Sequence, residues 1–285
     1  MLVLSYDSYI SYYHCLIEMK IFKDKHNLQK EILNKPISFI PTMGGLHNGH
    51  ISLIKKAKKY KKKTLVSIFV NPKQFSKKSE FRSYPRNKLN DLNILKNLDV
   101  NYLYLPSIKD IYDFKPKNKI YLHKFSKKLC GKYRKGHFKG VINVMNRLIE
   151  IIKPKEIFMG KKDYQQLFLV KKFISKNKIK SKIIECNTAR EKNGVAFSSR
   201  NSLLKKNEIK IASNIYQFIN KIKKRINLYT LNFLKSELKK LGADKVDYIE
   251  NYNIRQNFKK SNVYNKNCKI FIAYYIRNVR LIDNI

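Results

Sequence analysis

Two histidines, His47 and His50, lie three residues apart in a glycine-rich segment that reads PTMGGLHNGH and ends at His50. The segment follows a strand expected over residues 37–41 and opens an expected helix. Its three glycines have no Cβ, so the backbone can approach a phosphate group closely. Free N–H groups at a helix N-terminus favour an anion, and imidazoles can hydrogen-bond phosphate oxygens. The segment therefore predicts a phosphate-binding site.

Chance and zinc binding are the alternatives for this histidine pair. A short string of this kind occurs by chance in loops, and two histidines can also ligate zinc. A zinc site needs further ligands nearby, and neither the other histidines nor the dispersed cysteines form a suitable group. These residues are His14, His26, His123, His137, Cys15, Cys130, Cys186 and Cys268. Without a Cys-x-x-Cys pair, we expect reduced thiols and no disulfide framework.

Neutral amides follow the next expected strand, over residues 64–70. Asn71 and Gln74 stand at its carboxyl end, where open α/β sheets bind ligands. Amides at this place suit a polar, uncharged group. A simple Asn-Pro turn explains the same residues when they are taken alone.

Two later segments add charge and hydroxyl groups. Residues 160–166, GKKDYQQ, follow a strand expected over 156–159 and offer a lysine that can reach phosphate and an acid that can contact a ribose or a metal. Residues 196–201, AFSSRN, place two hydroxyls and a guanidinium in a turn, which suits the neutralisation of a triphosphate. A solvated surface loop is the alternative for each.

These motifs together resemble those of the pantothenate synthetase family, over nearly the whole chain. The similar segments, in the family's order, are PTMGGLHNGH, SIFVNPKQF, YPR, GHFKGV, KDYQQL, FSSRN and the terminal RLIDN. The resemblance implies that pantoate and ATP form enzyme-bound pantoyl adenylate and pyrophosphate, and that the β-alanine amine then displaces AMP. A carboxylate is ionised at neutral pH, so the first step depends on alignment and charge neutralisation and needs no general base.

The resemblance also implies roles for individual residues. Gln74 and Gln166 match the two glutamines that bind pantoate, and His50 matches the family's proton donor. The implied catalytic set is His47, His50, Lys162, Ser198, Ser199 and Arg200. The implied ATP contacts are Met43, Gly44, Gly45, Leu46, His47, Asn48, Gly49, His50, Gly160, Lys161, Lys162, Asp163, Ala189, Phe197, Ser198, Ser199 and Arg200. Mg²⁺ would arrive with the ATP phosphates, near Asp91, with no direct ligand assigned, and relatives indicate a homodimer.

The chain departs from the family's pattern at two acidic positions. Residues 129–131 read Leu-Cys-Gly where Leu-Glu-Gly is expected, so Cys130 replaces an acid. Residues 160–163 read Gly-Lys-Lys-Asp where Gly-Glu-Lys-Asp is expected, so Lys161 replaces the second. The first acid would orient neighbouring basic groups, and the lysine adds positive charge beside the phosphates. Neither change removes a group assigned to phosphate or pantoate, so we expect a working enzyme that is slower than its relatives.

The elements that must position these residues alternate between short strands and amphipathic helices from residue 37 to about 186, which is typical of a parallel sheet. We expect an α/β, Rossmann-like, doubly wound domain over residues 1–187. A smaller α+β domain over 188–285 would close over ATP. The expected strands span 37–41, 64–70, 102–105, 156–159, 182–186, 246–251 and 269–276, and the expected C-terminal helices span 208–224 and 231–241.

The charge balance of 62 Lys and Arg against 20 Asp and Glu gives a net charge of +42. Such a value suggests a polyanion partner, but the lysines are dispersed along the chain, and codon bias explains them without one. We therefore expect small-molecule partners and no dedicated nucleic-acid or membrane partner. No apolar run reaches the ~18 residues of a membrane span, and no secretory cleavage site is evident, so a cytoplasmic location is expected.

Two rival functions remain. Another nucleotidyl transferase with the H-x-G-H motif, such as a class I aminoacyl-tRNA synthetase, shares the adenylate chemistry, although the chain has no evident anticodon domain and has FSSRN in place of a lysine-rich signature loop. A nucleic-acid-binding module would require a clustered basic face and salt-sensitive binding.

Overall fold

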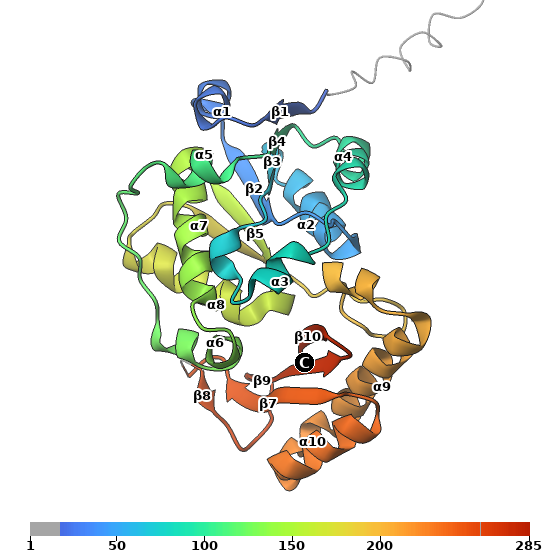
Figure 1. Ribbon diagram of the computed structural model, residues 1–285. Helices are drawn as coiled ribbons and strands as arrows, with labels where there is room; N and C mark the ends of the chain where they lie inside the picture. The colour runs from blue at the N-terminus through green and yellow to red at the C-terminus, as the bar shows by residue number, and fades with distance from the viewer. Residues whose placement is uncertain (1–17, 257) are drawn as a thin grey trace, which may run out of the picture.

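The computed structural model describes residues 18–256 and 258–285 and contains two separate sheets (Figure 1). His14 and Cys15 lie outside the described residues. The larger sheet is parallel throughout, in the spatial order β1-β4-β3-β2-β5-β6. Its strands are β1 (Lys20–Phe22), β2 (Ile37–Thr42), β3 (Lys63–Ile68), β4 (Tyr102–Tyr104), β5 (Glu156–Gly160) and β6 (Lys182–Cys186). The expected α/β fold is confirmed.

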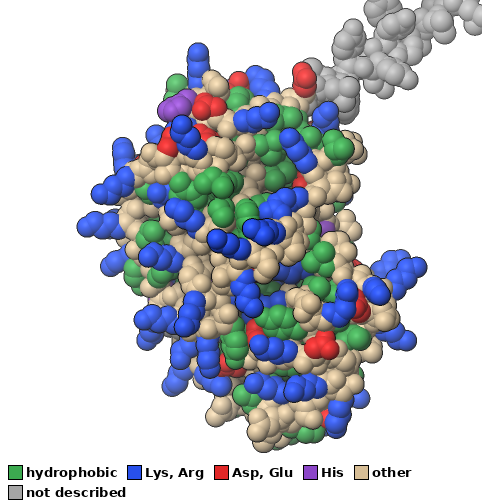
Figure 2. Space-filling view, viewed as in Figure 1, with side chains coloured by type: hydrophobic (Ala, Val, Ile, Leu, Met, Phe, Trp, Pro, Cys, Tyr) green, Lys and Arg blue, Asp and Glu red, His purple; other side chains and the backbone are tan. Residues whose placement is uncertain are grey.

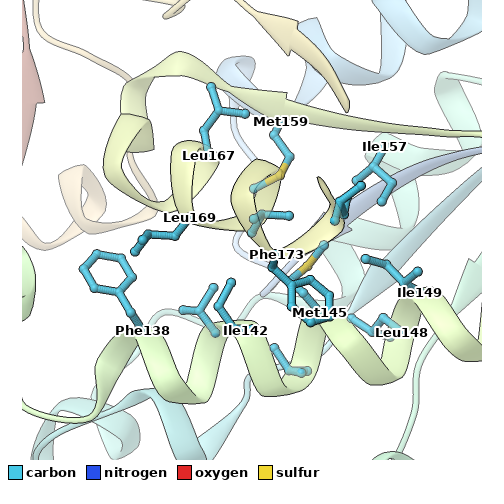
Figure 3. Packing of buried hydrophobic residues seen from close by; sticks show 14 of the residues in the cluster. Phe138, Ile142, Met145, Leu148, Ile149, Ile157, Met159, Leu167, Leu169 and Phe173 are labelled. Atoms are coloured by element: carbon cyan, nitrogen blue, oxygen red, sulfur yellow. The ribbon is translucent and has the colours of Figure 1, made fainter. Parts of the chain in front are cut away.

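Helices cover both faces of this sheet because alternate side chains of each strand enter different cores. In β2, Phe39 packs with one core and Ile40 with the other. The Phe39 core contains side chains of α1, α5, α7 and α8, and the Ile40 core those of α2 and α4. Figure 3 shows side chains of α7, such as Ile142 and Met145, pointing toward Phe173 of α8. The helices are α1 (Lys25–Ile32), α2 (Asn48–Lys58), α3 (Lys78–Arg82), α4 (Lys88–Asn97), α5 (Ile108–Tyr112), α6 (Cys130–Tyr133), α7 (His137–Ile152) and α8 (Tyr164–Lys176).

The strand order reverses between β2 and β5. From β2 the chain continues outward to β3 and β4, whereas β5 pairs on the opposite side of β2 and continues to β6. Ligands of open α/β sheets bind in the crevice outside the carboxyl ends of strands at such a reversal. The H-x-G-H segment follows β2 and the lysine segment follows β5, so this topology brings both motifs to one crevice.

Gly140 of α7 fixes how closely this helix approaches the loop that carries Gln74. That loop forms the short helix η2 (Pro72–Gln74). A Cβ at Gly140 would lie 2.1 Å from the carbonyl oxygen of Lys73 and 2.7 Å from the Cα of Gln74. The loop therefore depends on a residue without a side chain at this point of the helix.

Substitution of Gly140 by alanine is expected to lower the free energy of unfolding by about 1–3 kcal/mol, because backbone must move to relieve the overlap. Urea denaturation monitored by circular dichroism measures the change. Gly160→Ala is a matched control, since nothing lies within 4 Å of a Cβ built there and its φ is −76°. Equal stabilities of the two variants would contradict the prediction.

The second sheet is antiparallel, in the order β10-β9-β7-β8, and is covered by two helices. Its elements are η5 (Ser199–Leu203), α9 (Lys206–Ile222), η6 (Lys223–Leu228), α10 (Leu231–Lys240), β7 (Lys245–Asn253), β8 (Lys259–Lys260), β9 (Cys268–Ile276) and β10 (Val279–Asn284). This confirms the smaller α+β part of the expected fold, with β8 and β10 not anticipated. The boundary between residues 187 and 188 stays a prediction; β6 ends at Cys186.

Strand β7 carries an irregularity that matters for the site. Its register against β9 shifts between Val246 and Tyr248, which leaves Asp247 as an extra residue. Val246 packs with the small sheet's helices, whereas Tyr248 packs with the core of the larger part. In a regular strand, residues two apart face the same side, so the bulge is what turns Tyr248 the other way.

Candidate active site

A cavity of about 250 Å³ lies at the crevice between the two parts and is lined by residues of both. Most of the expected site residues border it. They are Met43, His47, Gly49, His50, Gln74, Gly160, Lys162, Asp163, Gln166, Ala189, Phe197, Ser198, Ser199 and Arg200. The expected ATP contacts that do not border it are Gly44, Gly45, Leu46, Asn48 and Lys161. Segments from four distant parts of the sequence therefore meet at one cavity.

The two histidines are held by the start of α2. His47 is the N-cap, and its Nδ1 accepts a hydrogen bond from the Gly49 N–H at 3.1 Å. His50 Nδ1 accepts from the His47 N–H at 3.4 Å, and the ring centroids are 4.1 Å apart. A Cβ at Gly49 would lie 2.8 Å from His47 Nδ1, so glycine is needed for this cap. Because each Nδ1 is an acceptor, the proton of each neutral ring is on Nε2, free to donate to a ligand.

Both rings are neutral at pH 7. Burial, and then the nearby Lys162 ammonium, lowers the pKa of His47 to about 4. Burial, followed by His47 and Lys162, lowers the pKa of His50 to about 3. The arrangement thus presents two neutral hydrogen-bond donors, and the negative charge of a triphosphate would raise both pKa values again.

Stability is expected to fall as the pH drops from 6.5 to 5. His47, His50 and His137 have pKa values of about 4, 3 and 3 in the fold, whereas the unfolded value is 6.5. The unfolded chain therefore binds protons first, and the stabilisation present above pH 6.5 is lost progressively below it. Thermal unfolding at pH 7, 6 and 5 tests this, with His50→Asn expected to show a shallower slope. A melting temperature that is constant over this range would contradict the assignment.

Asp91 of α4 holds the glycine loop from behind. Its Oδ2 accepts from the Gly45 N–H at 2.9 Å and its Oδ1 from the Leu46 N–H at 2.7 Å. Burial raises its pKa, while these two backbone bonds oppose the rise. Asp91 does not border the cavity, so its place in the fold is that of a residue that positions the loop. The expectation of magnesium near Asp91 gains no support from this geometry.

Lys162 is positioned by the last strand of the small sheet. The Asn284 side-chain amide of β10 donates to the carbonyl oxygens of Lys161 and Lys162, at 2.9 and 2.7 Å. The Lys162 ammonium is 3.6 Å from the Asp163 carboxylate and borders the cavity. The terminal RLIDN segment thus helps to fix the lysine loop, a role that the sequence did not suggest.

Lys161 is directed elsewhere. Its ammonium donates to Asn187 Oδ1 at 3.2 Å and lies 3.9 Å from the Glu185 carboxylate. It lines a separate pocket together with Lys269 and does not border the cavity that contains Lys162. The positive charge that this lysine adds is therefore partly compensated by Glu185, outside the cavity that Lys162 borders.

The amide of Gln74 is oriented by its neighbours. Asn71 donates to Gln74 Oε1 at 3.2 Å, which leaves the Gln74 amide nitrogen directed to Met43 Sδ at 2.7 Å. The backbone carbonyl oxygen of Gln74 accepts from His137 Nδ1 at 2.8 Å, so the Nε2 of His137 is an acceptor for Arg134 Nη1 at 3.0 Å. The structure in this way links the glutamine loop to a buried guanidinium.

The adjacent glutamines Gln165 and Gln166 have different surroundings. Gln165 is buried; it accepts from the Cys130 N–H at 3.1 Å and donates to the carbonyls of Phe125 and Lys128, both at 2.8 Å. Both glutamines border the cavity, and Gln166 is the less buried of the two. Because backbone groups already engage the side-chain amide of Gln165, Gln166 stays the expected substrate ligand of the pair.

Several cavity residues were not anticipated from the sequence. Arg134 lies two residues before the GHFKGV segment, His137 is the second residue of that segment, and Arg280 begins the RLIDN segment. Basic residues within and beside the recognised strings were therefore the available signal. Tyr84, within the recognised YPR string, also borders the cavity. Tyr248 also borders it, but its strand carries no sequence motif, and no signal pointed to it.

The described residues can also be searched for metal-ligand groups, a clustered basic surface and a membrane-spanning helix. Within residues 18–256 and 258–285, no group of three or more His, Cys, Asp or Glu side chains could hold a metal ion, and Cys130, Cys186 and Cys268 are free. Figure 2 shows Lys and Arg spread over both parts of the visible face and not gathered into one patch. Among the described helices, none combines the length and apolar character needed to cross a membrane.

Comparisons with known proteins show which family this chain is similar to. A family profile described as pantoate-beta-alanine ligase matches residues 17–285. A pantothenate synthetase of Francisella tularensis subsp. mediasiatica is 40% identical over 269 residues, covering 92% of this chain and 94% of its own.

Two solved structures are also similar. The pantoate-beta-alanine ligase of Francisella tularensis, complexed with beta-gamma ATP and beta-alanine, has a TM-score of 0.79 and 38% identity, covering 94% of this chain and 97% of its own. Pantothenate synthetase of Thermus thermophilus has a TM-score of 0.85 and 26% identity, covering 94% and 99%. This chain therefore belongs to the pantoate-beta-alanine ligase family and is a ligase.

Proposed function

We propose that the protein condenses pantoate with β-alanine at the expense of ATP, through an enzyme-bound pantoyl adenylate. The observation that carries this proposal is the composition of one cavity. It joins the two neutral imidazole donors and Lys162 to the amides of Gln74 and Gln166. The cations and donors suit phosphates, and the amides suit the hydroxyls of pantoate.

In the first step, a pantoate carboxylate oxygen bonds to the α-phosphorus of ATP while the bond from that phosphorus to the pyrophosphate oxygen breaks. Charge grows on the phosphate oxygens as this happens. His47 and His50 would donate their Nε2–H groups to these oxygens, and Lys162 and Arg200 would neutralise the charge. Gln74 and Gln166 would hold the pantoate in line.

In the second step, the neutral amine of β-alanine attacks the acyl carbon and AMP leaves with the bonding electrons. The amine must lose its proton, and the departing phosphate oxygen is the neighbouring acceptor. The His50 imidazole, which the resemblance implies as proton donor, would stabilise the leaving AMP by the same Nε2–H bond.

ATP would bring Mg²⁺ with it, and the fit of the cavity residues to this ion can be examined. Asp163 borders the cavity with its side chain 47% exposed, so its carboxylate offers an oxygen ligand. Asp91 has both carboxylate oxygens engaged by backbone N–H groups. Asp163 would be the residue to offer Mg²⁺ an oxygen ligand beside the phosphates, and the ion would reduce the charge on the phosphate oxygens.

The test is pyrophosphate release from ATP, measured with pantoate alone and then with β-alanine added. Pantoate alone is expected to support isotope exchange between ATP and pyrophosphate, and β-alanine to be required for net turnover to AMP and pantothenate. Exchange that requires another carboxylate would redirect the substrate assignment to a different adenylate-forming reaction. No exchange with any carboxylate would exclude the adenylate.

A further inference from the structure

A second group of charges borders the same cavity, apart from the histidine pair and Lys162. The guanidiniums of Arg134, Arg200 and Arg280 all line it. One Glu80 oxygen accepts from Arg134 at 3.2 Å and from Arg200 at 2.7 Å, so a single carboxylate serves both groups. Arg280 pairs with Asp247 instead, Nε to Oδ2 at 2.8 Å.

Arg280 is largely buried, but its hydrogen-bond donors are not all used. Its side chain is 12% exposed, and that of its partner Asp247 is 1% exposed. Its Nη1 faces the Cys130 sulfur at 3.6 Å, and sulfur is a weak acceptor. Its Nη2 is buried and has no hydrogen-bond partner among the described residues. A guanidinium that meets one carboxylate through Nε keeps donors on its terminal nitrogens for a ligand.

The charges of this group do not balance. Three guanidiniums meet two carboxylates, those of Glu80 and Asp247. The remaining position against Arg280 is taken by the Cys130 thiol and the Tyr248 hydroxyl, which are 3.0 Å from each other. One further carboxylate would balance the charge and satisfy the open donors, because a buried cation is stable when it is paired.

The proposed reaction brings two carboxylates into the cavity. The pantoate carboxylate must lie at the α-phosphorus, beside His50 and Lys162, because it is the attacking group. The β-alanine carboxylate takes no part in bond making and has no partner in that set. Resting on the proposed function, we infer that the guanidinium of Arg280, oriented by Asp247, binds the carboxylate of β-alanine and so selects amines that carry an acid group.

The position beside Arg280 is a thiol in this chain, where the family's pattern has an acid, so the guanidinium has one charged partner fewer here than in a member with that acid. A carboxylate at position 130 would pair with the guanidinium in the free protein, and the substrate would have to displace it. Cys130 fills the space with a weak acceptor and leaves the cation available. Asp247 fixes the guanidinium through Nε without occupying both terminal nitrogens.

The test compares β-alanine with 3-aminopropan-1-ol, which has the same amine and chain but no carboxylate. The unmodified protein is expected to prefer β-alanine in kcat/KM by on the order of a hundredfold or more, since the site would pair a charged group. In Arg280→Met this ratio is expected to fall below about tenfold, while exchange of pyrophosphate into ATP with pantoate stays within about threefold. The double variant Arg280→Met with Asp247→Asn removes both charges and keeps the test valid if the single variant does not fold.

Two results would overturn the inference: an unchanged preference for β-alanine in the variants, or an equal loss of exchange and of the full reaction. The first would exclude carboxylate binding by Arg280, and the second would assign it a general structural role. Absence of pantoate-dependent exchange in the unmodified protein would instead refute the proposed function itself, and this inference with it.

A pair of variants at position 130 tests the same inference without removing Arg280. Cys130→Glu and Cys130→Gln add nearly equal bulk, but only the glutamate can pair with the guanidinium. The KM for β-alanine is expected to be at least about tenfold higher in the glutamate variant than in the glutamine variant, because an internal charged pair competes with the substrate. Equal KM values would contradict the proposal.

Discussion

Replacement of His50 by asparagine is expected to slow pantoate-dependent exchange between ATP and pyrophosphate by on the order of 10²–10³-fold, the usual effect of losing one donor to transition-state charge. Asparagine keeps an acceptor near the position of Nδ1, so the bond from the His47 N–H to residue 50 can persist. It removes the Nε2–H that faces the ligand. The loss is expected in kcat more than in the KM for ATP, because the charge on the phosphate oxygens grows in the transition state.

Glutamine at the same position gives the complementary test. Its longer side chain places an N–H near the position of Nε2, so His50→Gln is expected to retain at least about tenfold more activity than His50→Asn. Exchange rates of the two variants at saturating ATP and pantoate, with matched melting curves, measure this difference. If the asparagine variant were the more active of the two, the donor role of Nε2 would have to be abandoned.

Lys162 and Lys161 are adjacent in sequence but face different surroundings, and this offers a matched pair. Lys162→Met is expected to reduce the exchange rate by on the order of 10²–10³-fold, because its ammonium borders the cavity beside His47 and His50 and would compensate phosphate charge. Lys161→Met is expected to stay within about threefold, because its ammonium pairs with Glu185 at a partly exposed place.

The two lysine variants remove the same charge from neighbouring residues, so a difference between them reports position and not net charge. Steady-state kinetics with varied ATP, at constant ionic strength, provides the measurement. If Lys161→Met had a larger effect than Lys162→Met, Lys161 would have to face the cavity when ATP binds. That result would remove the basis for assigning Lys162 to phosphate.

Much of the fold could be predicted because the strands of the parallel sheet are buried on both faces. The runs at Ile37, Thr64 and Glu156 are short and apolar, are followed by glycine or polar residues, and coincide closely with β2, β3 and β5. Strand β1 could not be predicted, since three residues at a sheet edge, two of them exposed, carry no periodic signal. Strand β10 was recognised as the string RLIDN without its strand character, because its polar residues serve contacts that are distant in sequence.

Site residues could be predicted where they form a motif of neighbouring residues, but not where their role depends on contacts between residues distant in sequence. The histidine spacing at His47 and His50 and the amides at Gln74 and Gln166 are visible in sequence, and the structure brings all of these to one cavity. Asp91 illustrates the opposite case. Its carboxylate serves two backbone N–H groups 45 and 46 residues away, and such a contact leaves no local pattern. The same is true of the pair between Asp247 and Arg280.

The bulge in β7 has a consequence for how the gene can change in length. The strand presents Val246 to one core and Tyr248 to the other because it holds one residue more than its neighbour at that point. Deletion of a codon for Asp247 would restore a regular pleat, which cannot satisfy both cores. Single-residue deletions should therefore be absent here among functional descendants.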